Sequence, residues 1–168
     1  MRGVLLFSLY NPAVSPSAFP GRILALDVGA RKIGLAVSDP LGITAQGLDT
    51  LRRTNKRSVL AYLESLIGEY KVAEIVVGYP LRMSGQPGAQ AEKVSAFAEE
   101  LRRRFRLPVH LWDERLTSAQ ANRVLRQSEI SIRRRGLAVD RLAAVLILQN
   151  FLESRTARPP AAEENHLN

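Results

Sequence analysis

The sequence predicts an α/β domain in which three antiparallel strands are followed by alternating helices and parallel strands. Two observations lead to this fold class. Short apolar runs bounded by turn residues come first, and amphipathic helical periodicity then alternates with further short apolar runs. Strands that are separated by helices pair in parallel through right-handed crossovers. The predicted order of elements is therefore βββ, α, β, α, β, α, α.

The first two strands form a hairpin between residues 22 and 39. Residues 23–26 are a continuous apolar run, typical of a strand buried on both faces, and Asp27 ends it. A turn that contains Gly29 follows, and residues 33–37 form the second apolar run. A carboxylate at the end of a buried strand needs a partner, which could be a metal ion or the backbone of its own turn. The hairpin alone leaves both interpretations open.

The rest of the chain alternates between helical and extended patterns. The expected elements are, in order, a strand over 43–51, a helix with an apolar face over 59–70, a strand over 74–78, a loop over 81–88, a helix over 91–105, a strand over 107–112, a helix that opens at the capping box 117–120, a loop over 127–139 and a last helix from Asp140. Residues 1–20 are expected to be a flexible arm and residues 154–168 a disordered tail. The folded domain is then residues 21–153.

The composition favours a soluble, cytoplasmic protein that binds a polyanion. The chain has 168 residues, of which 46% are apolar, and carries a net charge of +8, which points to nucleic acid. No apolar run approaches the length of a membrane span, so no membrane partner is expected. The chain has no cysteine and only two histidines, which excludes disulfides and argues against a zinc site. Any metal should therefore be a hard cation that is held by carboxylate oxygens.

Carboxylates follow two of the predicted strands. Asp27 closes the first strand, and Asp113 and Glu114 close the fifth. Because ligands gather at the carboxyl ends of parallel strands, and side chains alternate along a strand, one of the latter pair should face Asp27, and we favour Glu114. With Asp140, these acids would repel one another unless cations lay among them. They predict a site for two Mg²⁺ or Mn²⁺ ions that hydrolyses phosphodiester bonds. Asp140 could instead be only a helix N-cap, and Asp113 and Glu114 could solvate a strand end or pair with Arg115.

Basic residues near these acids are the candidate contacts to a nucleic-acid backbone. They lie in the first turn, after the fifth strand and in the predicted 127–139 loop, and they are Arg31, Lys32, Arg115, Arg133, Arg134 and Arg135. A run of three arginines is also typical of a solvated loop. Its place directly before Asp140 favours a functional interpretation.

Four segments of the chain, taken together, form a distinctive set: DVGARKIGLAVSD (27–39), IVVGYPLRMSG (75–85), DERLTS (113–118) and DRLAAVLILQNFL (140–152). In this order they resemble the YqgF/RuvX family of RNase H-like, Holliday-junction-resolvase-like nucleases. The resemblance implies an RNase H-like fold, with a five-stranded mixed sheet flanked by helices. It also implies phosphodiester cleavage that depends on a divalent metal.

The resemblance carries a site and a substrate as well. It implies Asp27, Glu114 and Asp140 as metal-binding acids, with Asp113 as the substitute for Glu114. Better-known resolvases place an acid on the fourth strand, whereas here that strand ends in Gly-Tyr-Pro at residues 78–80. The implied function is processing of the 5′ end of pre-16S rRNA. The alternatives are a Holliday-junction resolvase that acts on branched DNA and a non-catalytic RNA-binding factor in ribosome assembly.

Two further points concern rival functions and assembly. Kinases of the actin/Hsp70/sugar-kinase group also carry Asp-x-Gly before a second strand, but they need two such lobes and this chain has room for one. A four-way junction would suit a two-fold homodimer with paired active sites. Phosphate contacts carry little sequence information, so they leave RNA and DNA substrates open.

Overall fold

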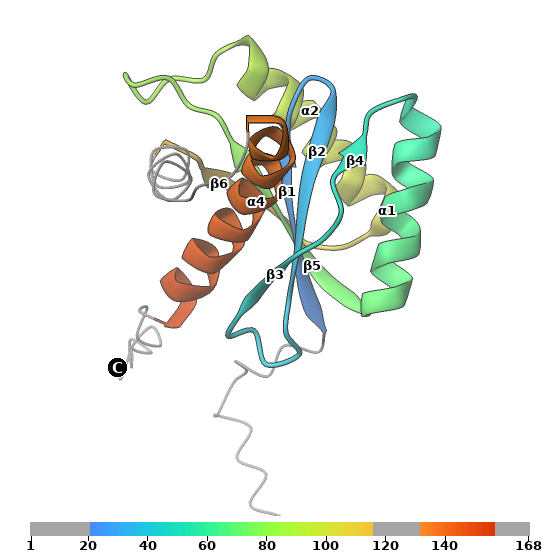
Figure 1. Ribbon diagram of the computed structural model, residues 1–168. Coiled ribbons are helices and arrows are strands. Elements are labelled where there is room, and N and C mark those ends of the chain that lie inside the picture. The colour runs from blue at the N-terminus through green and yellow to red at the C-terminus, as the bar shows by residue number, and fades with distance from the viewer. Residues whose placement is uncertain (1–20, 116–131, 157–168) are drawn as a thin grey trace, which may run out of the picture.

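A computed structural model describes residues 21–115 and 132–156, with the side chains of 21–115 and 141–156. Its centre is a sheet in the order β3-β2-β1-β5-β6, with β4 also paired to β2. The elements are β1 (Arg22–Val28), β2 (Lys32–Ser38), β3 (Ala45–Gly47), β4 (Leu51–Arg52), α1 (Lys56–Tyr70), β5 (Val72–Tyr79), α2 (Ala89–Phe105), β6 (Val109–Asp113) and α4 (Ile132–Thr156). Figure 1 shows α1 and α2 on one face of the sheet and α4 across the other.

The pairing of the strands confirms the predicted fold class. β1 is antiparallel to β2 and parallel to β5, and β5 is parallel to β6. The parallel strands are linked by α1 and α2, as right-handed crossovers require. The carboxyl ends of β1, β5 and β6 therefore meet at one edge of the sheet.

Strand β1 is buried on both faces, which explains its unbroken apolar run. Leu24 and Leu26 pack in the core beneath α1 and α2, whereas Ile23 and Ala25 pack in the core beneath α4. Each large side chain buried in this way stabilises the fold by roughly 1.5–3 kcal/mol. Asp27 continues the alternation of Ile23 and Ala25, so its side chain belongs to the α4 face.

The predicted third strand over 43–51 is interrupted. Its two parts, β3 and β4, both pair with β2, at Gly47↔Ala36 and Leu51↔Ile33, so β4 adds a short sixth strand to the predicted order. Arg141 of α4 packs closely against Gly47, and its guanidinium pairs with Asp49 at 2.7 Å. The strand therefore breaks where α4 crosses it.

The last helix begins earlier than the sequence analysis predicted. α4 starts at Ile132, so the prediction of a loop over 127–139 is wrong from residue 132 on, and residues 133–135 are helical. The segment is polar but consists largely of good helix formers, and its one glycine, Gly136, costs only about 1 kcal/mol. Apolar periodicity marks only the part of a helix that packs on a core. The predicted helix from 117 lies outside the described residues, as do residues 1–20 and 157–168.

The buried face of α4 uses only some of its apolar residues. Leu142, Val145 and Leu146 are half-buried. The fully covered positions are Ala144, Ile147, Leu148, Phe151 and Leu152. Every residue over 142–148 is apolar, so the sequence offers several faces for packing. Within the described ranges, no helix has the length and apolarity that a bilayer crossing requires.

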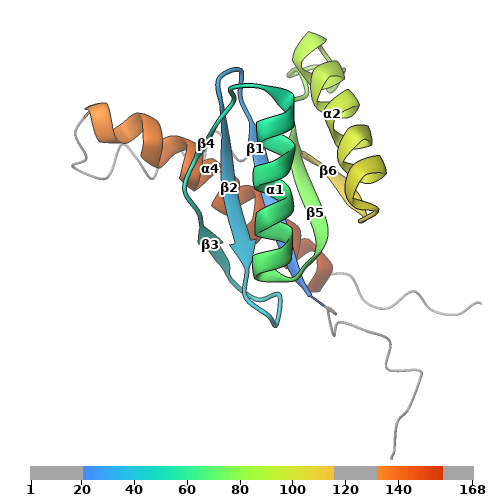
Figure 2. The same ribbon diagram turned by 90° about the vertical axis from the view of Figure 1, so that its right-hand side faces the viewer.

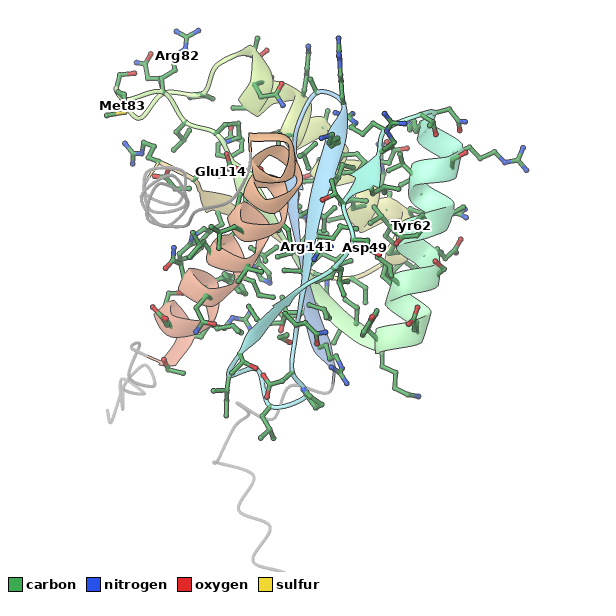
Figure 3. The ribbon with its side chains drawn as sticks, in the orientation of Figure 1. Asp49, Tyr62, Arg82, Met83, Glu114 and Arg141 are labelled. Carbon is green, nitrogen blue, oxygen red and sulfur yellow. The ribbon has the colours of Figure 1, made fainter. Side chains whose placement is uncertain are left out.

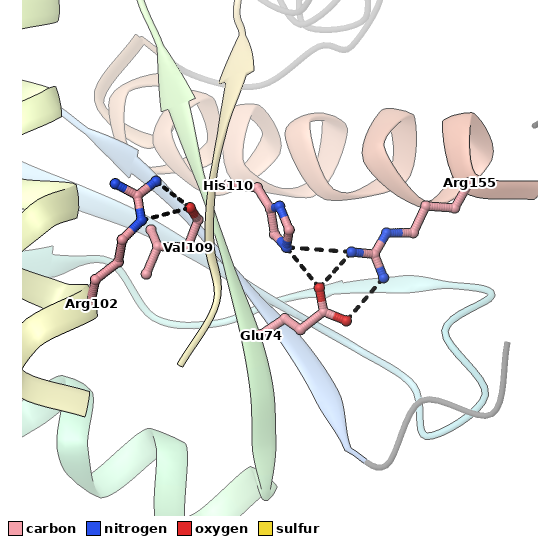
Figure 4. A network of polar contacts seen from close by, with 5 residues as sticks. All are labelled: Glu74, Arg102, Val109, His110 and Arg155. Atoms are coloured by element: carbon pink, nitrogen blue, oxygen red, sulfur yellow. Dashed lines mark hydrogen bonds and ion pairs between the residues drawn. The ribbon is translucent and has the colours of Figure 1, made fainter. Parts of the chain in front are cut away.

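A polar network ties the end of α4 to the start of β5 and β6 (Figure 4). Glu74 accepts a bond from Arg155 Nη1 at 3.0 Å and lies 2.7 Å from His110 Nε2. The Arg155 guanidinium, aided by His110, lowers the pKa of Glu74. The Glu74 side chain is only 17% exposed, because Arg155 and His110 cover it. The network holds α4 across the sheet at the end opposite to Asp27.

Candidate active site

Two carboxyl groups meet at the carboxyl edge of the sheet. Asp27 lies one residue before the end of β1, and Glu114 directly follows β6, where its backbone N–H donates to the Tyr79 carbonyl at 3.2 Å. Trp112 of β6 packs on the α4 side, and alternation places Glu114 on that same side. The Glu114 side chain hydrogen-bonds to the Asp27 side chain. Figure 3 shows Glu114 beside α4.

The environment of Glu114 changes its protonation. Burial, the charge of Asp27, the hydrogen bond between the two and the charge of Asp113 together raise the pKa of Glu114 to about 8. At neutral pH Glu114 therefore holds a proton, which it donates to the Asp27 carboxylate. The pair carries one negative charge where two ionised carboxylates would repel each other. A cation between the carboxyl groups would favour the ionised form of both.

Glycines on the neighbouring strands leave space for these carboxyl groups. Asp27 pairs with Gly34 on β2, and Gly78 lies on β5 just beyond the pair formed by Leu26 and Val77. A Cβ atom at Gly78 would lie 2.0 Å from Glu114 Oε1, closer than real Cβ atoms come to any neighbour. The Glu114 carboxyl group thus occupies the volume that a side chain at residue 78 would fill.

Asp113 points away from this pair and has a different partner. Its carboxylate receives bonds from Arg115 Nε at 2.8 Å and Nη2 at 2.6 Å, and Arg115 lowers the pKa of Asp113. The Arg115 guanidinium also lies 3.5 Å from the Cβ position of Gly85, in the loop after β5. The structure therefore brings Glu114, and not Asp113, to Asp27. The charge of Arg115 is paired with the Asp113 carboxylate.

Among the side chains that the structure describes, no group of three or more His, Cys, Asp or Glu residues could hold a metal ion. Within the described residues, the candidate cation site therefore consists of two carboxyl groups, those of Asp27 and Glu114. Carboxylate oxygens are the ligands that Mg²⁺ and Mn²⁺ prefer.

Comparison with known protein families gives the chain its lineage. A family model described as "RuvX: Holliday junction resolvase" matches residues 21–154. The chain belongs to the RuvX family. A relative from Koribacter versatilis, named "Putative pre-16S rRNA nuclease", is 66% identical over 140 residues, which are 83% of this chain and 92% of the relative. A relative of the same name from Moorella thermoacetica is 52% identical over 132 residues, which are 79% of this chain and 94% of the relative.

Solved structures with the same fold are distant in sequence. The RuvC protein of T. thermophilus, in complex with a Holliday junction substrate, superposes with a TM-score of 0.50 at 14% identity, over 81% of this chain and 96% of that one. The Holliday junction resolvase of fowlpox virus gives a TM-score of 0.51 at 16% identity, over 80% and 99%. These likenesses confirm the RNase H-like fold that the RuvX resemblance implied.

Asp140 and residues 133–135 of this RuvX chain belong to α4, but their side chains lie outside the described part. The helical repeat puts position 140 one turn before Ala144 and two turns before Ile147, both fully buried against the sheet. Ile147 Cδ1 lies 2.7 Å from the Cβ position of Gly78. The α4 backbone therefore runs over the end of the sheet where Asp27 and Glu114 meet.

The basic turn after Asp27 is held from the side by a residue that the sequence analysis missed. Gly29 N–H donates to the Lys32 carbonyl at 2.9 Å, which closes the turn and leaves Arg31 exposed. The Arg53 guanidinium donates to the Gly29 carbonyl at 2.8 Å, and the Arg53 N–H donates to the Arg31 carbonyl at 2.9 Å. No local pattern indicates Arg53, because its partners lie more than twenty residues earlier in the chain.

Proposed function

We propose that this protein is a divalent-metal-dependent nuclease that hydrolyses phosphodiester bonds in structured nucleic acid, and that its substrate is the 5′ end of pre-16S rRNA. The observation that carries the proposal is the contact between Asp27 and Glu114 at the carboxyl edge of the sheet. Membership of the RuvX family and the names of the relatives support both the reaction and the substrate.

The residues present fit a hard divalent cation. Two carboxyl groups in contact, one of them protonated because of the other, provide oxygen ligands whose repulsion a cation would relieve. Asp27, Glu114 and Asp140 would hold Mg²⁺ or Mn²⁺, with Asp113 kept apart by Arg115. A pair of such ions supplies an activated water and stabilises the leaving oxygen of a phosphodiester.

The protein's own groups position the substrate around this centre. Asp27 and Glu114 lie at the ends of rigid paired strands, so their separation is preset. Arg31, in the turn after β1, and Lys32, the first residue of β2, would contact phosphates next to the cleaved bond. Glu114 would have to give up its proton for both acids to hold a cation, so binding of the metal would depend on pH. Arg115 and residues 133–135 complete the set of proposed backbone contacts.

The test compares wild-type protein with Asp27→Asn in the presence of Mn²⁺, on a precursor-rRNA fragment and on a four-way DNA junction. We expect the wild type to cut the RNA, and Asp27→Asn to bind it without cutting. Asp49→Asn is the matched control, because Asp49 is 91% exposed and pairs only with Arg141 among the described residues. Cleavage by Asp49→Asn should equal that of the wild type. Binding by both proteins with cleavage by neither would favour a non-catalytic assembly factor.

A resolvase that acts on branched DNA is the second candidate. The family description and the likeness to resolvase folds favour it. A four-way junction has two symmetric cutting positions, so this candidate also requires a two-fold homodimer. Preferential cutting of the junction by a species with twice the monomer mass would support it over the RNA substrate.

A further inference from the structure

A furrow lined by basic residues runs between α1 and α2, which lie side by side on the face of the sheet away from α4 (Figure 2). One hollow of about 480 Å³ lies between the start of α1 and the middle of α2. A second, of about 760 Å³, adjoins it, since Lys56 and Glu100 line both. Together they form one continuous feature of the surface.

The furrow has a large excess of positive charge. Its cationic side chains all belong to exposed residues, and they are Arg53, Lys56, Arg57, Lys93, Arg103 and Arg104. Glu100 pairs with Lys56 at 2.6 Å, and Glu64 pairs with Arg104 at 3.0 Å. Within the described part of the chain, Arg57, Lys93 and Arg103 have no acidic partner. Like charges gathered in one furrow repel one another unless an anion lies among them.

The lining residues on α2 follow one face of that helix. On α2 the lining residues recur every three or four positions, from Lys93 through Phe97 and Glu100 to Arg103, which is one face of a helix. The half-buried Phe97 lines the furrow between the cations. Cationic side chains along a groove with an aromatic ring among them are typical of surfaces that bind single-stranded nucleic acid.

Both walls of the furrow are tied to the turn that follows Asp27. From α2, Gln90 Nε2 donates to the Val28 carbonyl at 3.2 Å, and before α1, Arg53 donates to the Gly29 carbonyl at 2.8 Å. The furrow and the acids lie on opposite faces of the sheet, and the basic turn joins them across its edge. A nucleic-acid strand that runs from the acids over Arg31 would enter the furrow next.

We propose that this furrow binds a single-stranded segment of RNA that flanks the cleaved bond. The proposal rests on the proposed nuclease function and names the form of its substrate on one side of the cut. Phe97 lies among the cations of the furrow. An unpaired base can stack on such a ring, whereas a base inside a duplex is already paired and stacked, so the furrow favours a single strand.

The test measures binding of fluorescent single-stranded RNA to the full chain, without divalent metal, across a range of salt concentrations. The Lys93→Ala, Arg103→Ala double variant removes two cations that have no acidic partner among the described residues. At about 0.7 counterions per phosphate contact, affinity should fall about 25-fold at about 0.1 M salt, and the salt slope should fall by about 1.4. Binding of duplex RNA should change much less.

The matched control removes two charges that do not line the furrow, from the C-caps of the same helices. Lys71 and Arg106 are exposed C-cap residues with φ of 52° and 53°, and asparagine tolerates that conformation. The Lys71→Asn, Arg106→Asn double variant should bind RNA nearly as the wild type does. Thermal unfolding confirms that both double variants are folded. Should the first be unfolded, Arg57→Ala replaces it, with about a fivefold loss expected.

Two results would overturn the proposal: equal binding of single-stranded RNA by the two double variants, or an equal loss on duplex RNA. Cleavage is scored separately. If the wild type cuts RNA and the furrow variant binds like the control, the nuclease stands without the furrow. If the wild type cuts nothing but the furrow variant loses binding to single strands, the furrow stands without the nuclease.

Discussion

Replacing Gly78 by alanine tests whether Glu114 acts from the position that the structure gives it. The added Cβ would lie 2.0 Å from Glu114 Oε1 and 2.8 Å from its Cδ. Real Cβ contacts stay beyond 3.0 Å, so the carboxyl group must withdraw by about 1 Å. The acid remains in the chain, but it leaves its place beside Asp27.

The size of the effect follows from the tolerance of a metal site. Ligating groups must be held within about 0.5 Å, and Mg²⁺ accepts little departure from octahedral geometry. A shift of about 1 Å should weaken Mn²⁺ binding by about 10- to 100-fold and slow cleavage by about 100-fold. The fold should lose only about 1–2 kcal/mol, because the crowded atoms are the ends of the flexible Glu114 and Ile147 side chains.

The assay is calorimetric titration with Mn²⁺, beside a cleavage measurement. Gly21→Ala is the matched control, because its Cβ would crowd the Lys71 carbonyl oxygen and lie 2.9 Å from Ala73 Cβ, before β1 and at the end of that strand opposite to Asp27. We expect Gly21→Ala to lose stability as well and to keep the Mn²⁺ affinity of the wild type. A Gly78→Ala protein with unchanged Mn²⁺ affinity and unchanged cleavage would refute the assignment of Glu114 as a ligand held over Gly78.

Two further predictions concern stability and pH. The raised pKa of Glu114, about 8, means that its favourable contribution is complete below the unfolded value near 4.5 and is lost as pH rises through 8. Without metal, the unfolding free energy of Glu114→Gln should therefore match that of the wild type near pH 5 and exceed it by on the order of 3 kcal/mol above pH 8. Added Mn²⁺ should stabilise only the wild type. Equal urea midpoints of the two proteins at both pH values would contradict this prediction. The lowered pKa of Glu74 has the opposite sign, so its contribution is present above its unfolded pKa and is lost on acidification. Glu74→Gln should lose about 1–2 kcal/mol at pH 7 and nothing at low pH, whereas the exposed Glu153→Gln should lose little at either, and a loss that persists in acid would count against the Arg155 network.

Much of the framework around the candidate site follows from local patterns. The apolar run that ends in Asp27 predicts a doubly buried strand, and β1 is one. Helical periodicity between the later strands predicts parallel crossovers, which bring the ends of β1 and β6 to one edge. Alternation along β6 separates Glu114 from Asp113, and the two indeed have different partners. These features are predictable because each depends on neighbours within a few residues.

Other features depend on contacts between distant segments. Glu74 reads as a solvated charge until α4 brings Arg155 to it, 81 residues later. The charges of the furrow belong to two helices whose relative placement no local pattern specifies. The sequence analysis places the start of the last helix too late, because residues 132–139 lack the apolar periodicity of a helix that packs on a core. Gly78 is the clearest example. Its lack of a side chain matters only because the Glu114 side chain, which directly follows β6, fills the space above it.

The closeness of the Gly78 Cβ position to the Glu114 carboxyl group implies that a carboxylate supplied from β5 would occupy the same place. Gly78 pairs with Trp112, two residues before Glu114, and its Cβ direction points at the Glu114 carboxyl group. An aspartate at 78 would therefore bring a carboxylate to the place that Glu114 vacates in a Glu114→Ala background. Because a hard cation responds to the position of the oxygens and not to their origin, the Gly78→Asp, Glu114→Ala double variant should recover Mn²⁺ affinity to within about tenfold of the wild type. Each single variant should lose more. If the double variant binds Mn²⁺ no better than Glu114→Ala alone, the site requires the acid at position 114 itself, and a carboxylate placed over Gly78 cannot replace it.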